Sequence, residues 1–226
     1  MKLAEVRKNY DAVSAYYDLA TDLIFHRLLG LYDWRKRAID RLQLRAGDTV
    51  LDIGCGTGNN FELIQQAVGS SGRIIGVDYS PGMLKRARRR CENAGWTNVV
   101  LLQDDVAQLD QVSQDVDACV SIWCLGIVHD LPAALRRMIT LTRSGGRISI
   151  LDFDRAVPAD GPLRYLFPLY RWLLIKSGID APEDMNSDRL QRRWNEGRCI
   201  LNEHLVAAEE ERYLWDGGLL ISGAVR

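Results

Sequence analysis

A short segment of this chain, Val50–Asn60, combines the residue types needed to bind a charged ligand. It places the carboxylate of Asp52 at the end of an apolar run and then sets glycines at alternate positions, Gly54, Gly56 and Gly58, before Asn59. Glycine tolerates a positive φ and carries no side chain, so the loop can lie flat against a ligand. The backbone N–H groups that begin the next helix can bind an anion or a polar edge. The segment therefore predicts a ligand site in which Asp52 binds an ammonium group.

Two more carboxylates follow the next two predicted strands. Asp78 ends the second β-branched run, and Asp105 follows the third, with Asp104 as the alternative. A carboxylate at the end of a strand can accept both hydroxyl groups of a ribose, which we expect of Asp78. Open α/β sheets bind ligands at the carboxyl ends of their strands. We therefore expect the three carboxylates to share one site.

These residues resemble the cofactor site of the class I S-adenosylmethionine (SAM)-dependent methyltransferases, whose first motif is similar to Val50–Asn59. The resemblance implies SAM as the cofactor and S-adenosylhomocysteine as the product. It also implies that Asp78 binds the ribose and that Asp105, followed by the small apolar Val106, holds the adenine amine. A dinucleotide site and a vestigial site are the alternatives. The G-x-G-x-G spacing differs from the G-x-G-x-x-G of dinucleotide-binding folds, whereas Asp78 fits both cofactors.

The segment from Tyr10 to Leu19 resembles the Tyr-Asp segment of the quinone C-methyltransferases and of bacterial phosphatidylethanolamine N-methyltransferases. In those enzymes, helices cover the SAM site and an aromatic residue reaches the methionine end. The resemblance makes Tyr17 the expected lid residue. The alternative is an amphipathic core helix with Tyr10, Val13 and Tyr17 on one face, and both can hold because a lid helix must also pack.

In the same family, the exit of the fourth strand, here Ser121–Asp130, lines the cavity between SAM and its acceptor. The quinone enzymes carry an Arg-Asn pair there that handles the substrate's oxygen, and the matching positions are Gly126 and Ile127. This departure argues against quinone methylation. His129 is the candidate catalytic residue, because an imidazole is a natural general base near neutral pH. A helix-entry residue beside Asp130 is the alternative.

The remaining motifs add no second site. We expect no metal, because Cys119 and Cys124 do not match a zinc ligand pattern. The basic run Lys85–Arg90 fits a solvated helix face better than a phosphate or lipid site. The residues expected to bind the cofactor, with Tyr79 and Met83 flanking the adenine, are Tyr17, Asp52, Gly54, Gly56, Gly58, Asn59, Asp78, Tyr79, Met83, Asp105, Val106 and Trp123.

Short β-branched runs that alternate with helical patterns must position these residues. They predict a single α/β domain with a doubly wound, Rossmann-like, mostly parallel sheet, an antiparallel terminal strand and N-terminal lid helices. The expected strands are residues 49–53, 73–77, 98–102, 116–123 and 147–153, with a hairpin around 216–218. The expected helices include 59–68, 81–94, 131–142, 163–177 and 188–194. The expected divisions are cap helices 1–45, a SAM-binding core 46–155, a variable substrate cover 156–196 and terminal strands 197–226.

Composition narrows the class of protein. A length of 226 residues suits one α/β domain, and a net charge of -1 gives no steering toward nucleic acid. Five cysteines without a CxxC indicate reduced thiols and a cytoplasmic protein. The N-terminus lacks the apolar region of a signal peptide, and no apolar run approaches the roughly 20 residues of a membrane span. A peripheral membrane contact stays open.

We therefore expect a SAM-dependent methyltransferase that acts, as a monomer or homodimer, on a small hydrophobic acceptor. A lipid amine, a quinol-like compound and a secondary metabolite are the candidates, and the aromatic cover Leu163–Ile175 favours a lipid-like molecule. One alternative is a SAM-binding enzyme that does not methylate, such as a cyclase, because a fold does not fix a function. A nucleic-acid methyltransferase is disfavoured by the balanced charge and by the lack of an [ND]-P-P-[YF] motif at Ser121–Asp130.

Overall fold

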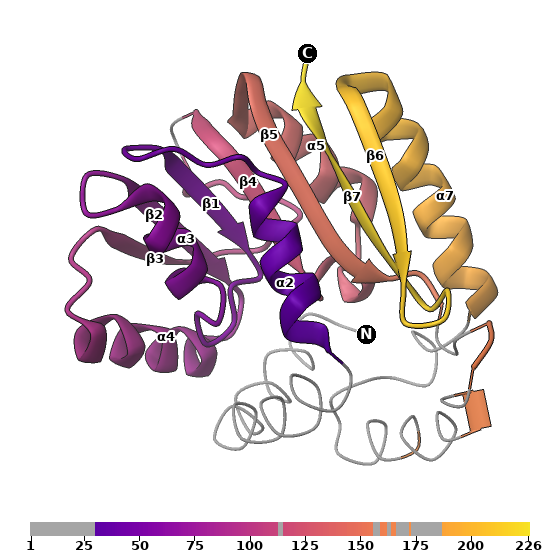
Figure 1. Ribbon diagram of the computed structural model, residues 1–226, viewed down its shortest axis with the longest axis horizontal. Coiled ribbons are helices and arrows are strands. Elements are labelled where there is room, and N and C mark those ends of the chain that lie inside the picture. Colours follow the sequence, from indigo (N-terminus) through magenta and orange to yellow (C-terminus); the bar gives the residue numbers. More distant parts are fainter. Residues whose placement is uncertain (1–29, 113–114, 156–158, 162–163, 166–171, 173–186) are drawn as a thin grey trace.

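The computed structural model describes residues 30–112, 115–155, 159–161, 164–165, 172 and 187–226 (Figure 1). Their centre is a seven-stranded sheet with the strand order β3-β2-β1-β4-β5-β7-β6. The first five of these strands pair in parallel, and β7 runs antiparallel to both of its neighbours. The expected mostly parallel sheet with an antiparallel terminal strand is confirmed. The strands are β1 Thr49–Ile53, β2 Arg73–Asp78, β3 Val99–Gln103, β4 Val116–Ile122, β5 Thr142–Phe153, β6 Leu205–Tyr213 and β7 Gly218–Val225.

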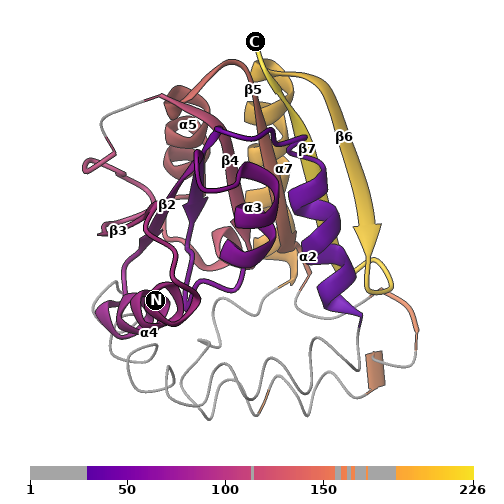
Figure 2. The ribbon, with the colours of Figure 1, turned by 60° about the vertical axis from the view of Figure 1, so that its left-hand side comes forward.

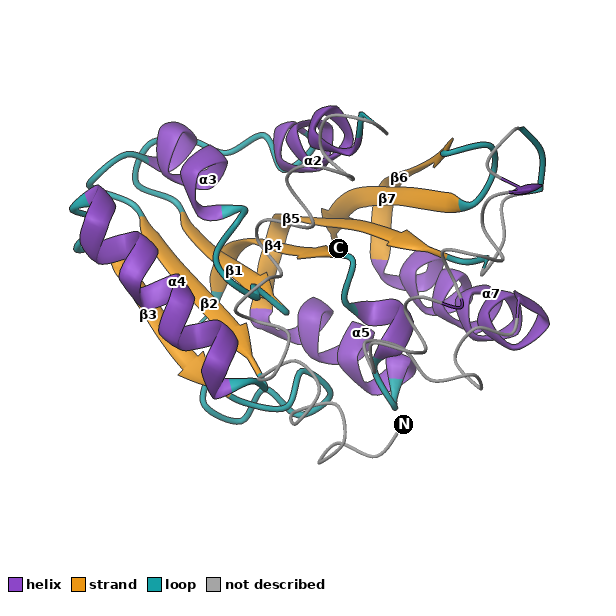
Figure 3. Cartoon of the chain, turned by 90° about the horizontal axis from the view of Figure 1, so that it is seen from below, coloured by secondary structure: helices purple, strands orange, loops and turns teal. Residues whose placement is uncertain are grey.

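Helices cover both faces of the sheet (Figure 3). One apolar cluster joins α2, α3 and α4 to side chains such as Val50, and a second joins α5 and α7 to Leu51 and Ile53. Strand β1 is therefore buried on both faces, as a parallel sheet requires. The helices are α2 Leu31–Asp40, α3 Phe61–Val68, α4 Pro81–Ala94, α5 Leu131–Leu141 and α7 Ser187–His204, with the 3-10 helix η2 Leu125–Ile127 after β4.

Helix α4 has the bounds that the sequence predicts, because its ends carry strong local signals. The Ser80 hydroxyl accepts a hydrogen bond from the backbone N–H of Met83 at 3.1 Å. Pro81 occupies the first turn, where its missing N–H costs nothing. Gly95 ends the helix with a φ of +70°. These caps fix the helix that follows the second carboxylate, Asp78.

Tertiary packing moves other boundaries. Helix α7 continues to His204, beyond the expected end at Trp194, so the terminal strands begin at Leu205 rather than near residue 197. Gly197 does not break the helix, because it lies against α5, where a Cβ would stand 3.0 Å from Leu135. Strand β5 also begins at Thr142 rather than at residue 147, because Thr142 pairs with Val116 ahead of a register shift in β4.

Several predicted segments fall outside the described residues. They include Tyr17 with the rest of residues 1–29, and most of the predicted helix at 163–177. The part of the N-terminal region that is described contains α2, which lies beside α3 on one face of the sheet (Figure 2). Across the described ranges, no helix is both long enough and apolar enough to cross a membrane.

Candidate active site

The glycine-rich loop between β1 and α3 leaves no room for side chains at two of its glycines. Gly54 has a φ of +67°, and a Cβ there would stand 2.2 Å from the Sγ of Cys124. Gly58 has a φ of +81°, and a Cβ there would stand 2.6 Å from the ring of Phe61. Conformation and space therefore both exclude a side chain. Cys124, which follows β4, therefore packs directly against the loop at Gly54.

The middle of the loop is open on one side and anchored on the other. Among the described residues, no atom lies within 4 Å of where a Cβ on Gly56 would stand, so this part of the chain leaves one side of the loop open. The Asp78 carboxylate anchors the loop by accepting hydrogen bonds from the N–H groups of Gly56 at 2.8 Å and Ser80 at 2.9 Å. These two bonds fix the Asp78 carboxylate at the end of β2, beside the loop.

Asp52 lies in β1, two residues before Gly54, and is fully buried. Both of its carboxylate oxygens accept hydrogen bonds from the Nδ2 of Asn60, at 2.9 and 3.1 Å. Burial raises the pKa of Asp52 to about 7, although the hydrogen bond from Asn60 and the charge of Arg35 oppose the rise. A neighbouring ammonium group would favour the ionised carboxylate. Asp52 is therefore suited to the ligand that the sequence predicts for it.

The structure distinguishes between the two adjacent carboxylates that follow β3. Asp104 folds back on its own loop, where its oxygens accept the N–H groups of Asp105 and Gln111, both at 2.8 Å. Asp105 uses one oxygen to accept the N–H of Ala107 at 3.0 Å. Its other oxygen lies 4.0 Å from the Nε2 of His129, whose side chain is 44% exposed. Asp105 is thus the better candidate for a ligand contact, and His129 lies next to the oxygen that would make it.

One residue of the basic run supports the loop instead of facing solvent. The Nε of Arg90 donates to the carbonyl oxygen of Thr57 at 3.0 Å, and its Nη2 donates to the Oδ1 of Asn59 at 2.6 Å. Lys85 and Arg89 are exposed, as the sequence predicts for a solvated face. The hydrogen bond from Arg90 thus orients the amide of Asn59, with its oxygen toward the guanidinium group.

The exit of β4 is held from two sides. The N–H of Gly126 donates to the buried carboxylate of Asp152 at 3.0 Å, and Arg193 of α7 donates to the carbonyl oxygens of Gly126 and Val128. Burial raises the pKa of Asp152 to about 6, against hydrogen bonds from backbone N–H groups. A Cβ on Gly126 would stand 2.9 Å from Asp152 Oδ1. A larger side chain at 126 therefore requires Asp152 to move, which gives a physical reason for the glycine.

Trp123 turns the chain at this exit, with a φ of +53°. Its indole Nε1 donates to the hydroxyl of Tyr213 at 2.8 Å, and that hydroxyl donates to the carbonyl oxygen of Asp152 at 3.2 Å. The guanidinium carbon of Arg35 lies 4.8 Å from the centroid of a Trp123 ring. Trp123 is therefore fixed by polar contacts on one edge and by a cation on its face.

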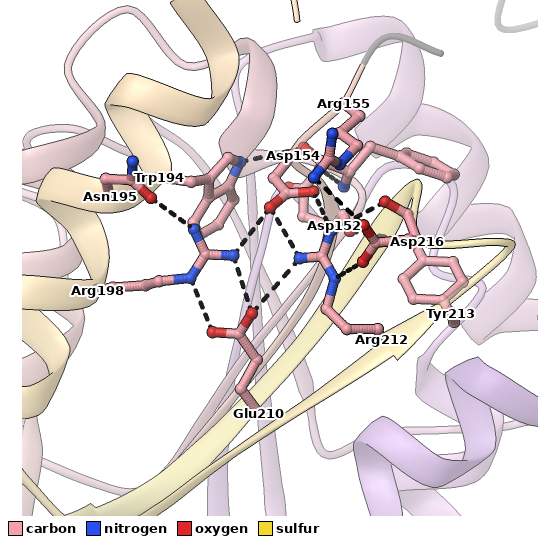
Figure 4. Close-up of polar contacts among 11 residues, drawn as sticks. Asp152, Asp154, Arg155, Trp194, Asn195, Arg198, Glu210, Arg212, Tyr213 and Asp216 are labelled. Carbon is pink, nitrogen blue, oxygen red and sulfur yellow. Dashed lines mark hydrogen bonds and ion pairs between the residues drawn. The ribbon is translucent and has the colours of Figure 1, made fainter. Parts of the chain in front are cut away.

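A network of ion pairs around the buried Asp154 supports the region just after β5 (Figure 4). The carboxylate of Asp154, 3% exposed, accepts hydrogen bonds from Arg198 of α7 and from Arg212 of β6. Glu210 and Asp216 complete the network around the two guanidinium groups. Burial raises the pKa of Asp154, but the two arginines outweigh burial and the net pKa is lowered. The network joins the end of β5 to α7 and to the β6–β7 hairpin.

The described site thus brings together most of the predicted positions. Tyr79 is half-buried and Val106 buried, Met83 is only 2% exposed, and Tyr17 lies outside the described residues; their cofactor roles stay predictions. Sequence reasoning missed the residues that hold these groups in place. The sequence places Asn60 inside the expected helix 59–68, whereas the structure places it at the N-cap of α3, which begins at Phe61. The missed residues are Arg35, Asn60, Asp152, Arg193 and Tyr213, together with the role of Arg90.

Comparisons with known proteins agree with this geometry. Residues 50–146 match the family described as "Methyltransferase domain". The chain is 32% identical over 193 residues to the ubiquinone/menaquinone biosynthesis C-methyltransferase UbiE of Vibrio vulnificus, covering 83% of this chain and 72% of that protein. It is 32% identical over 153 residues to the 2-phytyl-1,4-naphtoquinone methyltransferase of Thermosynechococcus vestitus, covering 67% and 66%. The N-methyltransferase NodS of Bradyrhizobium japonicum, solved with S-adenosylhomocysteine, has a TM-score of 0.66 at 18% identity and 98% coverage of both chains.

Proposed function

We propose that this chain, which belongs to the class I SAM-dependent methyltransferases, transfers the methyl group of SAM to a small, hydrophobic acceptor. Its cofactor is SAM. The proposal rests on one observation above all, the three carboxylates Asp52, Asp78 and Asp105 that stand at the carboxyl ends of neighbouring strands around an open glycine loop. Carboxylates in this arrangement match an ammonium group, a ribose and an adenine amine, which are the polar parts of SAM.

We assign the ligand contacts from the geometry of these groups. Asp52 would bind the ammonium group of the methionine, and Asp78, at the end of β2 beside the loop, would bind the ribose hydroxyls. Asp105 would accept the adenine amine on the oxygen that faces His129. The accessible side of Gly56 would lie against the cofactor. The SAM molecule supplies a methyl group on a positively charged sulfur, and the protein's part is to orient it and exclude water.

A hydrophobic acceptor agrees with the residues at the β4 exit. Trp123 and Ile127 are partly exposed there, and Gly126 presents no side chain. Two of the proteins named above are a ubiquinone/menaquinone biosynthesis C-methyltransferase and a 2-phytyl-1,4-naphtoquinone methyltransferase, and this supports an apolar acceptor here. Gly126, however, faces the carboxylate of Asp152, so no arginine can handle a quinone oxygen from this position without displacing Asp152. We therefore place lipid amines and phenolic metabolites beside quinols as candidate acceptors.

The general-base role predicted for His129 competes with the adenine contact of Asp105. The Nε2 of His129 lies 4.0 Å from the Asp105 oxygen that would accept the adenine amine. This position puts the imidazole at the adenine end of the site rather than at the transferred methyl group. We propose that His129 closes the adenine end and that methyl transfer depends mainly on proximity and desolvation.

The proposed function has a direct test in two steps. Calorimetry should first show that the wild type binds SAM and S-adenosylhomocysteine, and that Asp78→Ala weakens both without loss of fold. A SAM-consumption screen against quinols, phenols, lipid amines and phospholipids should then yield S-adenosylhomocysteine with one apolar class. Tight binding of SAM with turnover only on RNA or DNA would overturn the proposed acceptor class. No binding of SAM would overturn the proposed cofactor site.

A further inference from the structure

A buried chain of polar side chains connects Asp52 to helix α2. The Nδ2 of Asn60 donates to both oxygens of Asp52, and the Oδ1 of Asn60 accepts a hydrogen bond from the Nη1 of Arg35. All three side chains are buried, with exposures of 6% for Arg35, 3% for Asn60 and 0% for Asp52. We propose that Arg35 is a positioning residue for the cofactor site, which acts through Asn60 to orient the Asp52 carboxylate and keep it ionised for the SAM ammonium group. This inference rests on the proposed function.

The amide of Asn60 can serve only one orientation between these two charges. Its oxygen faces a guanidinium, which can only donate, and its NH₂ group faces a carboxylate, which when ionised can only accept. The reversed amide would place donor against donor and acceptor against acceptor. Arg35 therefore fixes which end of Asn60 faces Asp52. Without that cation, only the ionised Asp52 itself would hold the NH₂ group toward its oxygens, and a protonated Asp52, which can also donate, would no longer fix the amide.

Arg35 itself is held at a fixed place by the β4 exit. Its guanidinium lies over the ring of Trp123, and the indole of Trp123 is hydrogen-bonded to the hydroxyl of Tyr213 near the end of β6. Tyr213 is fully enclosed, with its hydroxyl bonded to the backbone of Asp152 in β5. The cation is thus oriented by two strands that follow the cofactor loop in sequence. A charge that is fixed and removed from water interacts more strongly with its neighbours, because the local dielectric constant is low.

The charges that surround Asp52 come from several elements. Arg35 of α2 and the Asn60 amide favour its ionised form, whereas Asp78 of β2 disfavours it. The thiols of Cys55, Cys119 and Cys124 also adjoin it, and burial raises their pKa values well above the usual range, so they stay neutral.

With the pKa of Asp52 already raised to about 7, loss of the Arg35 charge would raise it further. Near neutral pH the carboxylate would then be largely protonated.

The test compares two ligands that differ only at the amino-acid end. S-adenosylhomocysteine carries the ammonium group, and 5′-methylthioadenosine shares the adenosine thioether but lacks it. We would measure both affinities by calorimetry between about pH 6 and 8.5, a range that spans the pKa of Asp52. The variants are Arg35→Gln, which removes the charge, and Arg35→Lys, which keeps it. Arg37→Gln is the matched control, because Arg37 lies two residues away on α2 with its side chain 53% exposed.

We expect Arg35→Gln to bind S-adenosylhomocysteine about fivefold more weakly at pH 7, because a rise of roughly one unit in the pKa of Asp52 lowers its ionised fraction from about one half to about one tenth. The loss should shrink as the pH rises, because the raised pKa of Asp52 is then exceeded. Arg35→Lys should recover most of the affinity, and Arg37→Gln should match the wild type. Affinity for 5′-methylthioadenosine should stay unchanged in all variants.

Three results would overturn the role of Arg35 while leaving the proposed function standing. They are wild-type affinity for S-adenosylhomocysteine in Arg35→Gln, equal losses for both ligands, and a loss that does not vary with pH. Equal losses would mean that Arg35 only supports the fold. If the wild type binds S-adenosylhomocysteine at no pH, the proposed function fails and this inference falls with it.

Discussion

Replacement of Gly54 by alanine tests how closely the β4 exit is seated on the cofactor loop. An alanine in this left-handed conformation, at a φ of +67°, costs about 1–2 kcal/mol. Its Cβ would also stand 2.2 Å from the Sγ and 2.5 Å from the Cβ of Cys124, far inside contact distance, and overpacking of this kind costs about 1–3 kcal/mol. We therefore expect a loss of about 2–5 kcal/mol in the free energy of unfolding. For a chain of this size, that lowers the Tm by about 4–20 °C.

The contribution of the clash can be isolated with Cys124→Gly. This change removes both close atoms and leaves the Cα of Cys124 at 3.9 Å, an ordinary contact distance. In a double-mutant cycle with Gly54→Ala, we expect a favourable coupling of about 1–3 kcal/mol, measured by thermal and denaturant unfolding. S-adenosylhomocysteine affinity should recover in parallel, because the loop returns to its original path.

Gly56→Ala is the matched control for the conformational cost. Gly56 also has a positive φ, of +55°, but a Cβ there meets no atom of the described residues within 4 Å, so only the backbone cost of about 1–2 kcal/mol should remain. The reasoning is refuted if Gly54→Ala is no less stable than Gly56→Ala. It is refuted equally if the effects of Gly54→Ala and Cys124→Gly are simply additive.

Three further changes probe the site and its supports. His129→Ala should weaken SAM binding by up to about tenfold with kcat nearly unchanged, whereas a kcat reduced about 10²–10⁴-fold at unchanged SAM affinity would make His129 the general base. Arg90→Gln should weaken S-adenosylhomocysteine binding severalfold, because the loop loses two hydrogen bonds. Arg89→Gln, at an exposed position, should leave binding unchanged, and equal effects of the two changes would mean that Arg90 does not support the loop. Asp154→Asn should cost about 2 kcal/mol at pH 7, less than a fully buried pair, because Arg198 and Arg212 are partly exposed and keep Glu210 and Asp216. Because the folded-state pKa of Asp154 is lowered, that stability is present above the unfolded pKa and is lost as the pH falls through the folded one, so a difference that does not shrink as the pH is lowered would contradict its origin.

Local sequence signals determined the cofactor half of this protein. The strand runs, the alternate glycines and the caps of α4 each depend on residues near one another in the chain, and the structure has them where the sequence predicts. The carboxylates Asp52, Asp78 and Asp105 could be identified because a parallel sheet brings the carboxyl ends of its strands to one edge. Their positions after successive strands, together with the resemblance to the methyltransferase family, made them the candidates, and their ligand contacts stay predictions.

The groups that hold these carboxylates were decided only by tertiary structure. Arg35 reaches Asn60 across 25 positions of the chain, and Tyr213 reaches Trp123 across 90. The hydrophobic periodicity of the sequence does not relate residues so far apart, and each of them by itself fits an ordinary helix or strand position. The same holds for Gly126. The sequence shows only that a side chain is lacking there, and the structure shows that the Asp152 carboxylate occupies the adjacent space. Motifs record the groups that contact a ligand, whereas the charge and orientation of those groups depend on neighbours that folding alone brings together.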